Sequence, residues 1–400
     1  MNFFNNKLVM KTDQKLDITI VTGTRAEFGL LKKLIKKINK DEQLNLSLSV
    51  TGSHLSSLHG ETINEIINEG LKIDSKVDLN LKFDNPKNIS SATANGIIGY
   101  SKIFSKFKPD LLIILGDRYE ILAAVLAACF ENIPIAHIHG GERTEGLIDE
   151  SIRHAITKFS HLHFVACEIY RKRVIQLGEN PKNVYNVGGL GVDAINELKL
   201  LNKSEIEKKL NIKFRNKNLL ITYHPETLDN KLSIIGISEL LKSLEKIKNT
   251  TLIFTLPNAD QNNKIIIAKI NSFVSNKSFA YAFSSLGQLN YFSLLKICDG
   301  VVGNSSSGLL EAPSFKKATI NIGNRQKGRI KAKSVIDCEP DEKKISASID
   351  EIYNKKFQNI LKNIKSPYGE PGASDRIIDI IKKTELKSLI KKAFYDLEKK

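Results

Sequence analysis

The sequence predicts an α/β protein built from two Rossmann-like domains, each with a parallel β-sheet. Short β-rich runs alternate with amphipathic helical patterns from residue 17 onward, which is typical of βα units. The alternation occurs as two series, separated by a charged, helix-prone stretch at residues 197–209. The length of 400 residues also exceeds what one compact domain usually holds.

The first series begins with the buried-strand pattern Asp17–Thr22 and the loop Gly23-Thr24-Arg25. A helix follows this loop, because apolar residues recur there at a spacing of three or four from Leu30 to Ile38. Five further strands are predicted in this series: Leu46–Val50, Leu111–Leu115, Ile133–Ile138, Leu162–Ala166 and Val184–Val187.

The second series repeats the same alternation. Its predicted strands are Leu219–Tyr223, Leu252–Thr255, Phe279–Ala282, Gly300–Val302 and Thr319–Ile322. We therefore expect an N-terminal extension at 1–16, a first domain at 17–195, a second at 196–375 and a final helix at 376–400 that packs back on the first domain. Ligands of parallel sheets bind at the carboxyl ends of the strands, so the sequence predicts a site in a cleft between the domains.

Composition excludes several classes of protein. The N-terminus lacks the apolar run of a signal peptide, and no stretch approaches the roughly 20 apolar residues of a membrane span. The four cysteines are far apart, which argues against disulfides and structural zinc. The net charge of +16 comes mostly from lysines spread over helical patterns. We expect a soluble cytoplasmic protein that binds neither membrane nor nucleic acid.

Acidic and basic side chains cluster after predicted strands of the first domain. Asp117 follows the run LLIIL, where a half-desolvated carboxylate can pair with a neighbouring cation or transfer protons, and where it can also cap the next helix. The segment HIHGGER presents Glu142 after two glycines, and its two histidines lack a third metal ligand at suitable spacing. Glu150, Arg153 and His154 share one face of a predicted helix, for catalysis or for a surface salt bridge. Several carboxylates in one crevice suit general acid/base chemistry.

Anion-binding features follow other strands. Arg25 and the backbone N–H groups of its loop can hold a phosphate, although a tight turn with a surface arginine is an equal alternative. In the second domain, His224 ends the first strand, and the loop Gly303–Gly308 carries three serines before a helix that contains Glu311. Hydroxyls and free N–H groups at such a helix start favour a pyrophosphate.

The motifs GTRAE, GDRYE, HIHGGERTEGLIDESIRHAITK, HPET, GNSSSGLLEAP and NIGNRQKGR occur in this order along the chain. Together they resemble the hydrolysing UDP-N-acetylglucosamine 2-epimerases of sialic and legionaminic acid biosynthesis, over roughly residues 17–380. The resemblance implies the GT-B-like fold of many glycosyltransferases, with no metal and no cofactor. It also implies a homo-oligomer, a dimer or a tetramer.

The implied reaction has two stages, elimination of UDP to a 2-acetamidoglycal and then addition of water with inversion at C2. The resemblance assigns catalysis to five residues: Asp117, Glu142, Glu150, Arg153 and His154. It assigns substrate binding to ten: Arg25, Glu27, His224, Asn258, Ser305, Ser306, Ser307, Gly308, Glu311 and Arg329. It leaves open which carboxylate removes the C2 proton.

The expected substrate is UDP-N-acetylglucosamine, with UDP-N,N′-diacetylbacillosamine as the alternative. A GT-B glycosyltransferase is the rival enzyme, but it has no need for three carboxylates in its first domain. A further alternative is a non-catalytic nucleotide-sugar sensor or a nucleic-acid-binding protein. Only the positive charge favours this alternative.

Overall fold

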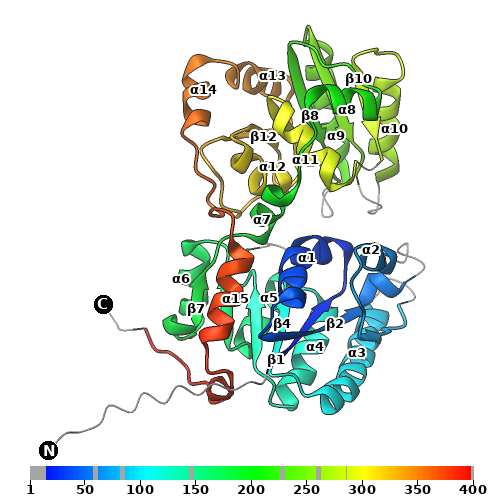
Figure 1. Ribbon diagram of the computed structural model, residues 1–400. Coiled ribbons are helices and arrows are strands. Elements are labelled where there is room, and N and C mark those ends of the chain that lie inside the picture. The colour runs from blue at the N-terminus through cyan, green and yellow to red at the C-terminus, as the bar shows by residue number, and fades with distance from the viewer. Residues whose placement is uncertain are drawn as a thin grey trace, which may run out of the picture. The chain divides into compact units, whose positions relative to one another are not determined.

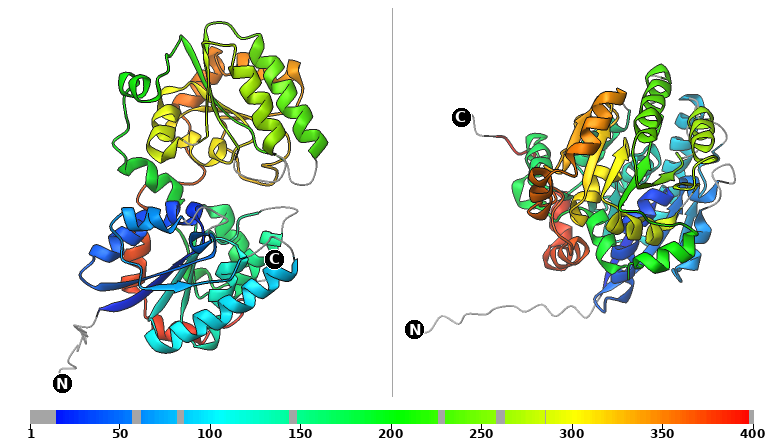
Figure 2. Two further views of the ribbon diagram at one scale, coloured as in Figure 1. Left: turned by 90° about the vertical axis from the view of Figure 1, so that its right-hand side faces the viewer. Right: turned by 90° about the horizontal axis from the view of Figure 1, so that it is seen from above.

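The computed structural model describes residues 15–56, 62–81, 86–143, 148–225, 230–257, 263–284 and 286–397. The chain divides into two compact units (Figures 1 and 2). Unit 1 comprises residues 1–142, 146–187 and 372–400, and unit 2 comprises residues 143–145 and 188–371. The main chain thus passes into unit 2 after Val187, eight residues before the expected boundary at 195, because the helix that starts at Leu190 belongs to unit 2.

Unit 1 contains a seven-stranded parallel sheet in the order β3-β2-β1-β4-β5-β6-β7. Its central strand β4 is buried along its whole length, as expected for a parallel sheet that is covered on both faces. The strands are β1 (Leu16–Thr22), β2 (Leu44–Thr51), β3 (Ser75–Val77), β4 (Leu111–Leu115), β5 (Ile135–Ile138), β6 (Leu162–Val165) and β7 (Val184–Asn186).

Helices cover both faces of this sheet (Figure 2). Tyr100 and Phe104 of α3 stack on each other in the core, with ring centroids 5.5 Å apart. The helices are α1 (Arg25–Lys40), α2 (Ile63–Asn68), α3 (Pro86–Phe107), α4 (Tyr119–Phe130), α5 (Ile148–Phe159), α6 (Glu168–Gln176) and α15 (Ala373–Lys383), with 3-10 turns η1 (Gly52–Leu55), η3 (Pro181–Asn183) and η5 (Leu386–Ile390).

Unit 2 contains a six-stranded parallel sheet in the order β10-β9-β8-β11-β12-β13. Alternate residues of β8 enter different core clusters, Leu219 and Ile221 on one face and Leu220 on the other, as the two-residue repeat of a strand requires. The strands are β8 (Lys217–Thr222), β9 (Thr250–Thr255), β10 (Ala280–Phe283), β11 (Gly300–Gly303), β12 (Ala318–Ile322) and β13 (Val335–Cys338). The helices are α7 (Leu190–Glu197), α8 (Lys203–Leu210), α9 (Asn230–Glu245), α10 (Asn263–Val274), α11 (Gly287–Ile297), α12 (Ser307–Leu310), α13 (Glu342–Glu351) and α14 (Lys355–Lys362), with the 3-10 turn η4 (Ala312–Phe315).

All eleven predicted strands are present, with ends shifted by one or two residues. The sequence analysis missed β3 and β13, which are the edge strands next to β2 and β12. Both are short and carry charged residues, with the sequences SKV and VIDC. An edge strand pairs on one side only, so it needs no long apolar run.

The final helix packs on unit 1, as predicted, but it is shorter than predicted. Lys37 of α1 pairs with Asp375 of α15, and Lys382 of α15 pairs with Asp41; Figure 1 shows α15 beside α1. The prediction that one helix continues to Leu397 is wrong, since α15 ends at Lys383 and a 3-10 turn follows. Tertiary contacts direct the chain beyond it, because Lys392 donates to the Lys158 and Ser160 carbonyls.

None of the helices in the described parts of the chain is long and apolar enough to cross a membrane.

Candidate active site

The strand order reverses once in each sheet, between β1 and β4 in unit 1 and between β8 and β11 in unit 2. Such switch points leave a crevice at the carboxyl ends of the strands, where open α/β sheets bind ligands. The loops that follow β1 and β4 hold Arg25 and Asp117, and those that follow β8 and β11 hold His224 and the three serines. The topology therefore places these residues at the switch point of their unit, whereas Glu142 and α5 follow the neighbouring strand β5.

Asp117 lies after β4 and accepts a hydrogen bond from the Arg153 guanidinium on α5. The side chain of Arg153 is only 6% exposed, so this is a largely buried ion pair and not the surface salt bridge of the alternative interpretation. The helix-cap alternative for Asp117 is wrong as well, because Arg118 occupies the N-cap position of α4 and no side chain caps it.

His137 fixes the backbone just before Asp117. This fully buried ring donates from Nε2 to the Gly116 carbonyl at 2.8 Å, and its Nδ1 lies 3.1 Å from Thr157 Oγ1. Burial lowers the pKa of His137 to about 3, so the ring is neutral at pH 7. His137 is thus a structural histidine.

Glu142 follows β5, and its Oε1 lies 3.1 Å from His139 Nδ1. His139 has a φ of +66°, an uncommon conformation for a non-glycine residue that often marks functional loops. On α5, His154 Nε2 lies 3.3 Å from Glu150 Oε1, which confirms that these two residues share a helix face. The neighbouring Asp149, which the sequence analysis did not select, is half-buried, and this burial raises its pKa even though Arg118 opposes the rise.

The loop after β1 starts α1, with Thr24 as the N-cap that accepts from the Glu27 amide at 3.2 Å. Arg25 is 59% exposed and its Nε lies 2.8 Å from Glu65 Oε1. The side chain of Glu27, unlike that of Arg25, points into the protein. It is 5% exposed, and its Oε2 accepts from the Gly23 amide at 2.7 Å.

In unit 2, the buried Asn304 joins three loops. Its side chain accepts from the His224 amide at 2.7 Å and donates to the His224 carbonyl at 2.8 Å. Its own carbonyl accepts from Arg325 at 3.1 Å and from Gln326 at 2.9 Å. The sequence analysis quoted Asn304 but gave it no role, because a side chain that bonds to backbone atoms 80 residues away leaves no local pattern.

Ser305–Ser307 form a turn after β11, the serine turn. A residue that the sequence analysis missed holds this turn. Tyr291 of α11 donates to Ser307 Oγ at 2.7 Å, and the Ser307 amide lies 3.4 Å from Ser305 Oγ. The following α12 is only four residues long, and Glu311 is its C-cap and not an interior residue. Its helix dipole is therefore small, so an anion at this turn would depend on hydroxyls and individual N–H groups.

Glu311 and Arg329 complete the described part of this region. Burial raises the pKa of Glu311, while a hydrogen bond with Ser307 and the charge of Arg329 lower it. Gly308 has no room for a side chain, since a Cβ would lie 2.5 Å from Thr319 Cγ2. The predicted Asn258 lies outside the described residues. Within the described ranges, His, Cys, Asp and Glu side chains form no group of three that could hold a metal ion.

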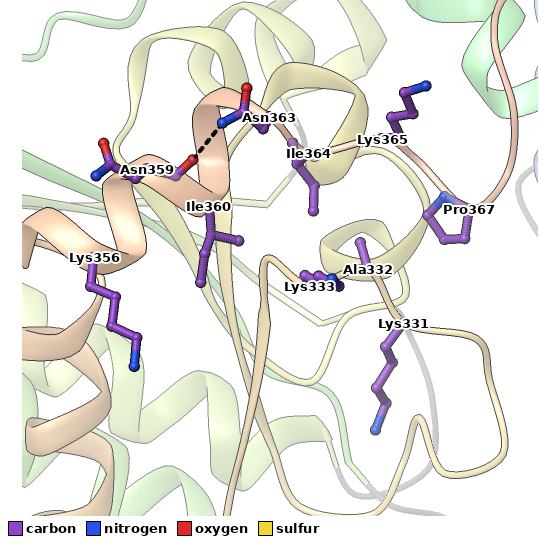
Figure 3. A pocket seen from close by; sticks show the side chains of 10 residues that line it. All are labelled: Lys331, Ala332, Lys333, Lys356, Asn359, Ile360, Asn363, Ile364, Lys365 and Pro367. Atoms are coloured by element: carbon purple, nitrogen blue, oxygen red, sulfur yellow. Dashed lines mark hydrogen bonds between the residues drawn. The ribbon is translucent and has the colours of Figure 1, made fainter.

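A basic depression in unit 2 lies apart from these loops (Figure 3). It has a volume of about 600 Å³ and is lined by four lysines, namely Lys331, Lys333, Lys356 and Lys365. Lys331 is paired with Asp337. None of the predicted site residues lines this depression, so it does not compete with the strand-end loops as the candidate active site.

Comparisons with known proteins identify the family of the chain. The family profile described as UDP-N-acetylglucosamine 2-epimerase matches residues 36–382. The chain is 42% identical over 385 residues to a Campylobacter jejuni protein named GDP/UDP-N,N′-diacetylbacillosamine 2-epimerase (hydrolyzing), covering 96% of this chain and 100% of that protein. It is 39% identical to the Escherichia coli polysialic acid biosynthesis protein P7, covering 95% and 97%.

Among solved structures, the UDP-GlcNAc 2-epimerase from Neisseria meningitidis bound to UDP-GlcNAc superimposes with a TM-score of 0.73 and 22% identity, covering 92% of this chain and 100% of that one. A Listeria monocytogenes structure titled putative UDP-N-acetylglucosamine 2-epimerase gives 0.77 and 17%, covering 92% and 96%. These likenesses confirm the two-domain, GT-B-like fold class. With its match to the family profile over most of its length, the chain belongs to the UDP-N-acetylglucosamine 2-epimerase family and is an epimerase.

Proposed function

We propose that the protein is a hydrolysing 2-epimerase that converts a UDP-linked 2-acetamido sugar into UDP and the free sugar inverted at C2. The observation that carries this proposal is the placement of Asp117 at the switch point of unit 1, with Glu142 and Glu150 after the neighbouring strand β5, and of hydroxyl and N–H donors at the switch point of unit 2. The names of two relatives, 42% and 33% identical, both include the word hydrolyzing, which supports release of a free sugar over release of a UDP-linked one.

The reaction needs two steps whose atoms balance. In the elimination, a base takes the C2 proton while the C1–O bond to UDP breaks, which leaves a 2-acetamidoglycal. In the hydration, the oxygen of a water adds to C1, and C2 gains a proton on the face opposite to the one that lost it. Because C2–H is barely acidic, stabilisation of the departing diphosphate must lower most of the barrier.

We assign the proton transfers to unit 1. Asp117, Glu142 and Glu150 are the candidate acid/base carboxylates, and Asp149 joins them because it is half-buried beside Glu150 and burial raises its pKa. Arg153 orients Asp117. His154, which lies beside Glu150, is a further contact to the substrate.

We assign UDP binding to Arg25 and to unit 2. The Ser305–Ser307 turn and Gly308 offer hydroxyl and N–H donors to the diphosphate, and His224 and Arg329 add donors beside it. Glu311 accepts the ribose hydroxyls. Asn258 belongs to the same proposed set. Asn304 positions the His224 backbone and the loop of Arg325 for this task.

Two sugar nucleotides are candidates for the substrate. UDP-N-acetylglucosamine is the simpler one, and the name of the 39% identical relative, a polysialic acid biosynthesis protein, is compatible with it. UDP-N,N′-diacetylbacillosamine appears in the names of the relatives that are 42% and 33% identical. The two sugars differ around C4 and C6 and react at the same C1 and C2 atoms, so the proposed chemistry is common to both.

Proton NMR in D₂O tests the proposal with each nucleotide sugar separately. We expect release of UDP without any acceptor, a free sugar inverted at C2, and deuterium at C2. A UDP-linked epimer would exclude the hydrolysing reaction. UDP release that depends on an added acceptor would identify a glycosyltransferase instead. The sugar that is consumed faster at equal concentration identifies the substrate.

A further inference from the structure

The Gly23 peptide, directly before the loop of Arg25, is held from three sides. Its N–H donates to Glu27 Oε2 at 2.7 Å, and its carbonyl accepts from Ser53 Oγ at 3.0 Å. A side chain at Gly23 would place its Cβ 2.7 Å from Glu120 Cγ. The loop after β1 is therefore built directly against two glutamates.

Glu27 and Glu120 are both buried, with exposed fractions of 5% and 1%. Glu120 Oε1 and Glu27 Oε2 lie 3.4 and 3.5 Å from the same point, the position that a Gly23 Cβ would occupy. Glu120 Oε1 also accepts from Arg118 Nε at 2.6 Å. The remaining oxygens, Glu27 Oε1 and Glu120 Oε2, have no hydrogen-bond partner among the described residues.

Two buried carboxyl groups thus lie close together, and one of them pairs with the guanidinium of Arg118, whose side chain is 45% exposed. A second buried negative charge without its own cation is costly, and carboxyl groups in this situation keep a proton instead. The pKa of Glu27 is raised to about 8, first by burial and then by the charge of Glu120, while the Gly23 hydrogen bond and the charge of Arg118 act in the opposite direction.

The other titratable groups around the pair supply no further cation at pH 7. Tyr100, from α3, has its pKa raised by burial, with smaller contributions from Glu27 and Glu120, and is a neutral phenol. His54, from η1, has its pKa lowered to about 4 by burial and is a neutral imidazole. Among the described residues that face the pair, Arg118 on α4 is therefore the positive charge.

We propose that Glu27 and Glu120 form a positioning pair that carries one proton at neutral pH. Protonated Glu27 holds the Gly23 amide, and Glu120 holds the Arg118 guanidinium. The pair thereby fixes the loop after β1 to the loop after β4, which carry Arg25 and Asp117. Glu27 then acts through the loop and not by direct contact with the substrate. The inference rests on the proposed function only where it assigns these loops to the substrate.

The variant Glu27→Gln tests the pair, because an amide keeps the oxygen that accepts from Gly23 and cannot ionise. In thermal unfolding, the wild-type protein should become less stable as the pH rises from 5 to 8, because the folded state must keep a proton on Glu27 that the unfolded chain releases. Glu27→Gln should not show this loss.

Glu120→Gln removes the anion that holds Arg118, so the same hypothesis predicts a raised KM and a fold that still unfolds cooperatively. The matched control is Glu131→Gln, which changes an exposed carboxylate that accepts from Ser105 at the far end of α4. It should match the wild type in kinetics and in the pH dependence of unfolding.

Two results overturn the inference. One is a loss of kcat of about 100-fold or more in a folded Glu27→Gln at pH 7, which is the size of a direct role in proton transfer. The other is parallel pH dependence of unfolding for Glu27→Gln and the wild type. Failure of the proposed function looks different, because the wild type would release no UDP while the unfolding comparison would still report on the pair.

Discussion

The Arg153 guanidinium on α5 donates to the Asp117 carboxylate 36 residues earlier, in the loop after β4. The two side chains are 6% and 20% exposed, so the carboxylate that we propose for proton transfer is oriented by a cation from another element. The relationship links two of the predicted catalytic residues and makes the effects of their substitutions separable.

We expect Asp117→Asn to lower kcat by about 100-fold or more, the usual contribution of general acid/base catalysis. The amide preserves the volume of the carboxylate but cannot accept a proton, so the affinity for UDP should remain near the wild-type value. UDP release and calorimetric UDP titration measure the two quantities. Near-full turnover would remove Asp117 from the proposed mechanism.

Arg153→Met should destabilise unit 1, because it leaves the Asp117 charge poorly solvated. Loss of one partner of a buried ion pair costs about 3–5 kcal/mol, and the partial exposure of Asp117 places the expected loss at or below the lower end. The double variant Asp117→Asn/Arg153→Met should unfold with a loss smaller than the sum of the single losses. Denaturant unfolding of all four proteins completes the cycle, and additive losses would contradict a direct interaction.

Tyr291→Phe should weaken UDP binding by about 3- to 10-fold, which corresponds to one ordinary hydrogen bond. The change removes the hydroxyl that donates to Ser307 Oγ and leaves the ring in place. Tyr281→Phe is a matched control in the same unit, because its hydroxyl donates to the Ser278 carbonyl, away from the serine turn. Equal UDP affinities of both variants and the wild type would show that the serine turn does not depend on Tyr291.

Glu179→Gln should lower the thermal stability of the protein at neutral pH. Burial alone would raise the pKa of Glu179, but the hydrogen bond and charge of His163, followed by Lys158 and Lys392, lower it to about 2. Because the folded-state pKa of Glu179 lies below the unfolded value, the ionised carboxylate stabilises the fold above about pH 4.5. This stabilisation is lost as the pH falls towards 2.

The loss of one charge-assisted hydrogen bond, about 1.5–3 kcal/mol, should lower the melting temperature by several degrees at pH 7. The difference in melting temperature between Glu179→Gln and the wild type should become smaller below pH 4.5. Glu168→Gln serves as the control, since Glu168 forms an exposed pair with Arg171. A gap that stays constant from pH 7 to 3 would show that Glu179 does not stabilise the fold through its charge.

Local sequence was sufficient for the central strands. Strands such as β4 and β11 are buried along their length, so their apolar runs are unmistakable, and the polar residues that follow them lie at the switch points. Local sequence was not sufficient for β3 and β13, whose structure depends on pairing with one neighbouring strand. It was also not sufficient for the chain after α15, where Lys392 contacts Glu179 and the Ser160 carbonyl.

The amino-acid sequence by itself determined the α/β class, the order of the strands along the chain and the loops that carry the charged and hydroxyl side chains, because these follow from periodicity and from residues close together in the chain. Only the tertiary structure decided what each of those side chains contacts: Glu27 faces inward to Gly23, Asp117 pairs with Arg153, and Tyr291 holds Ser307. Burial, hydrogen-bond partners and pKa values depend on which distant segments pack together. No local pattern encodes that packing.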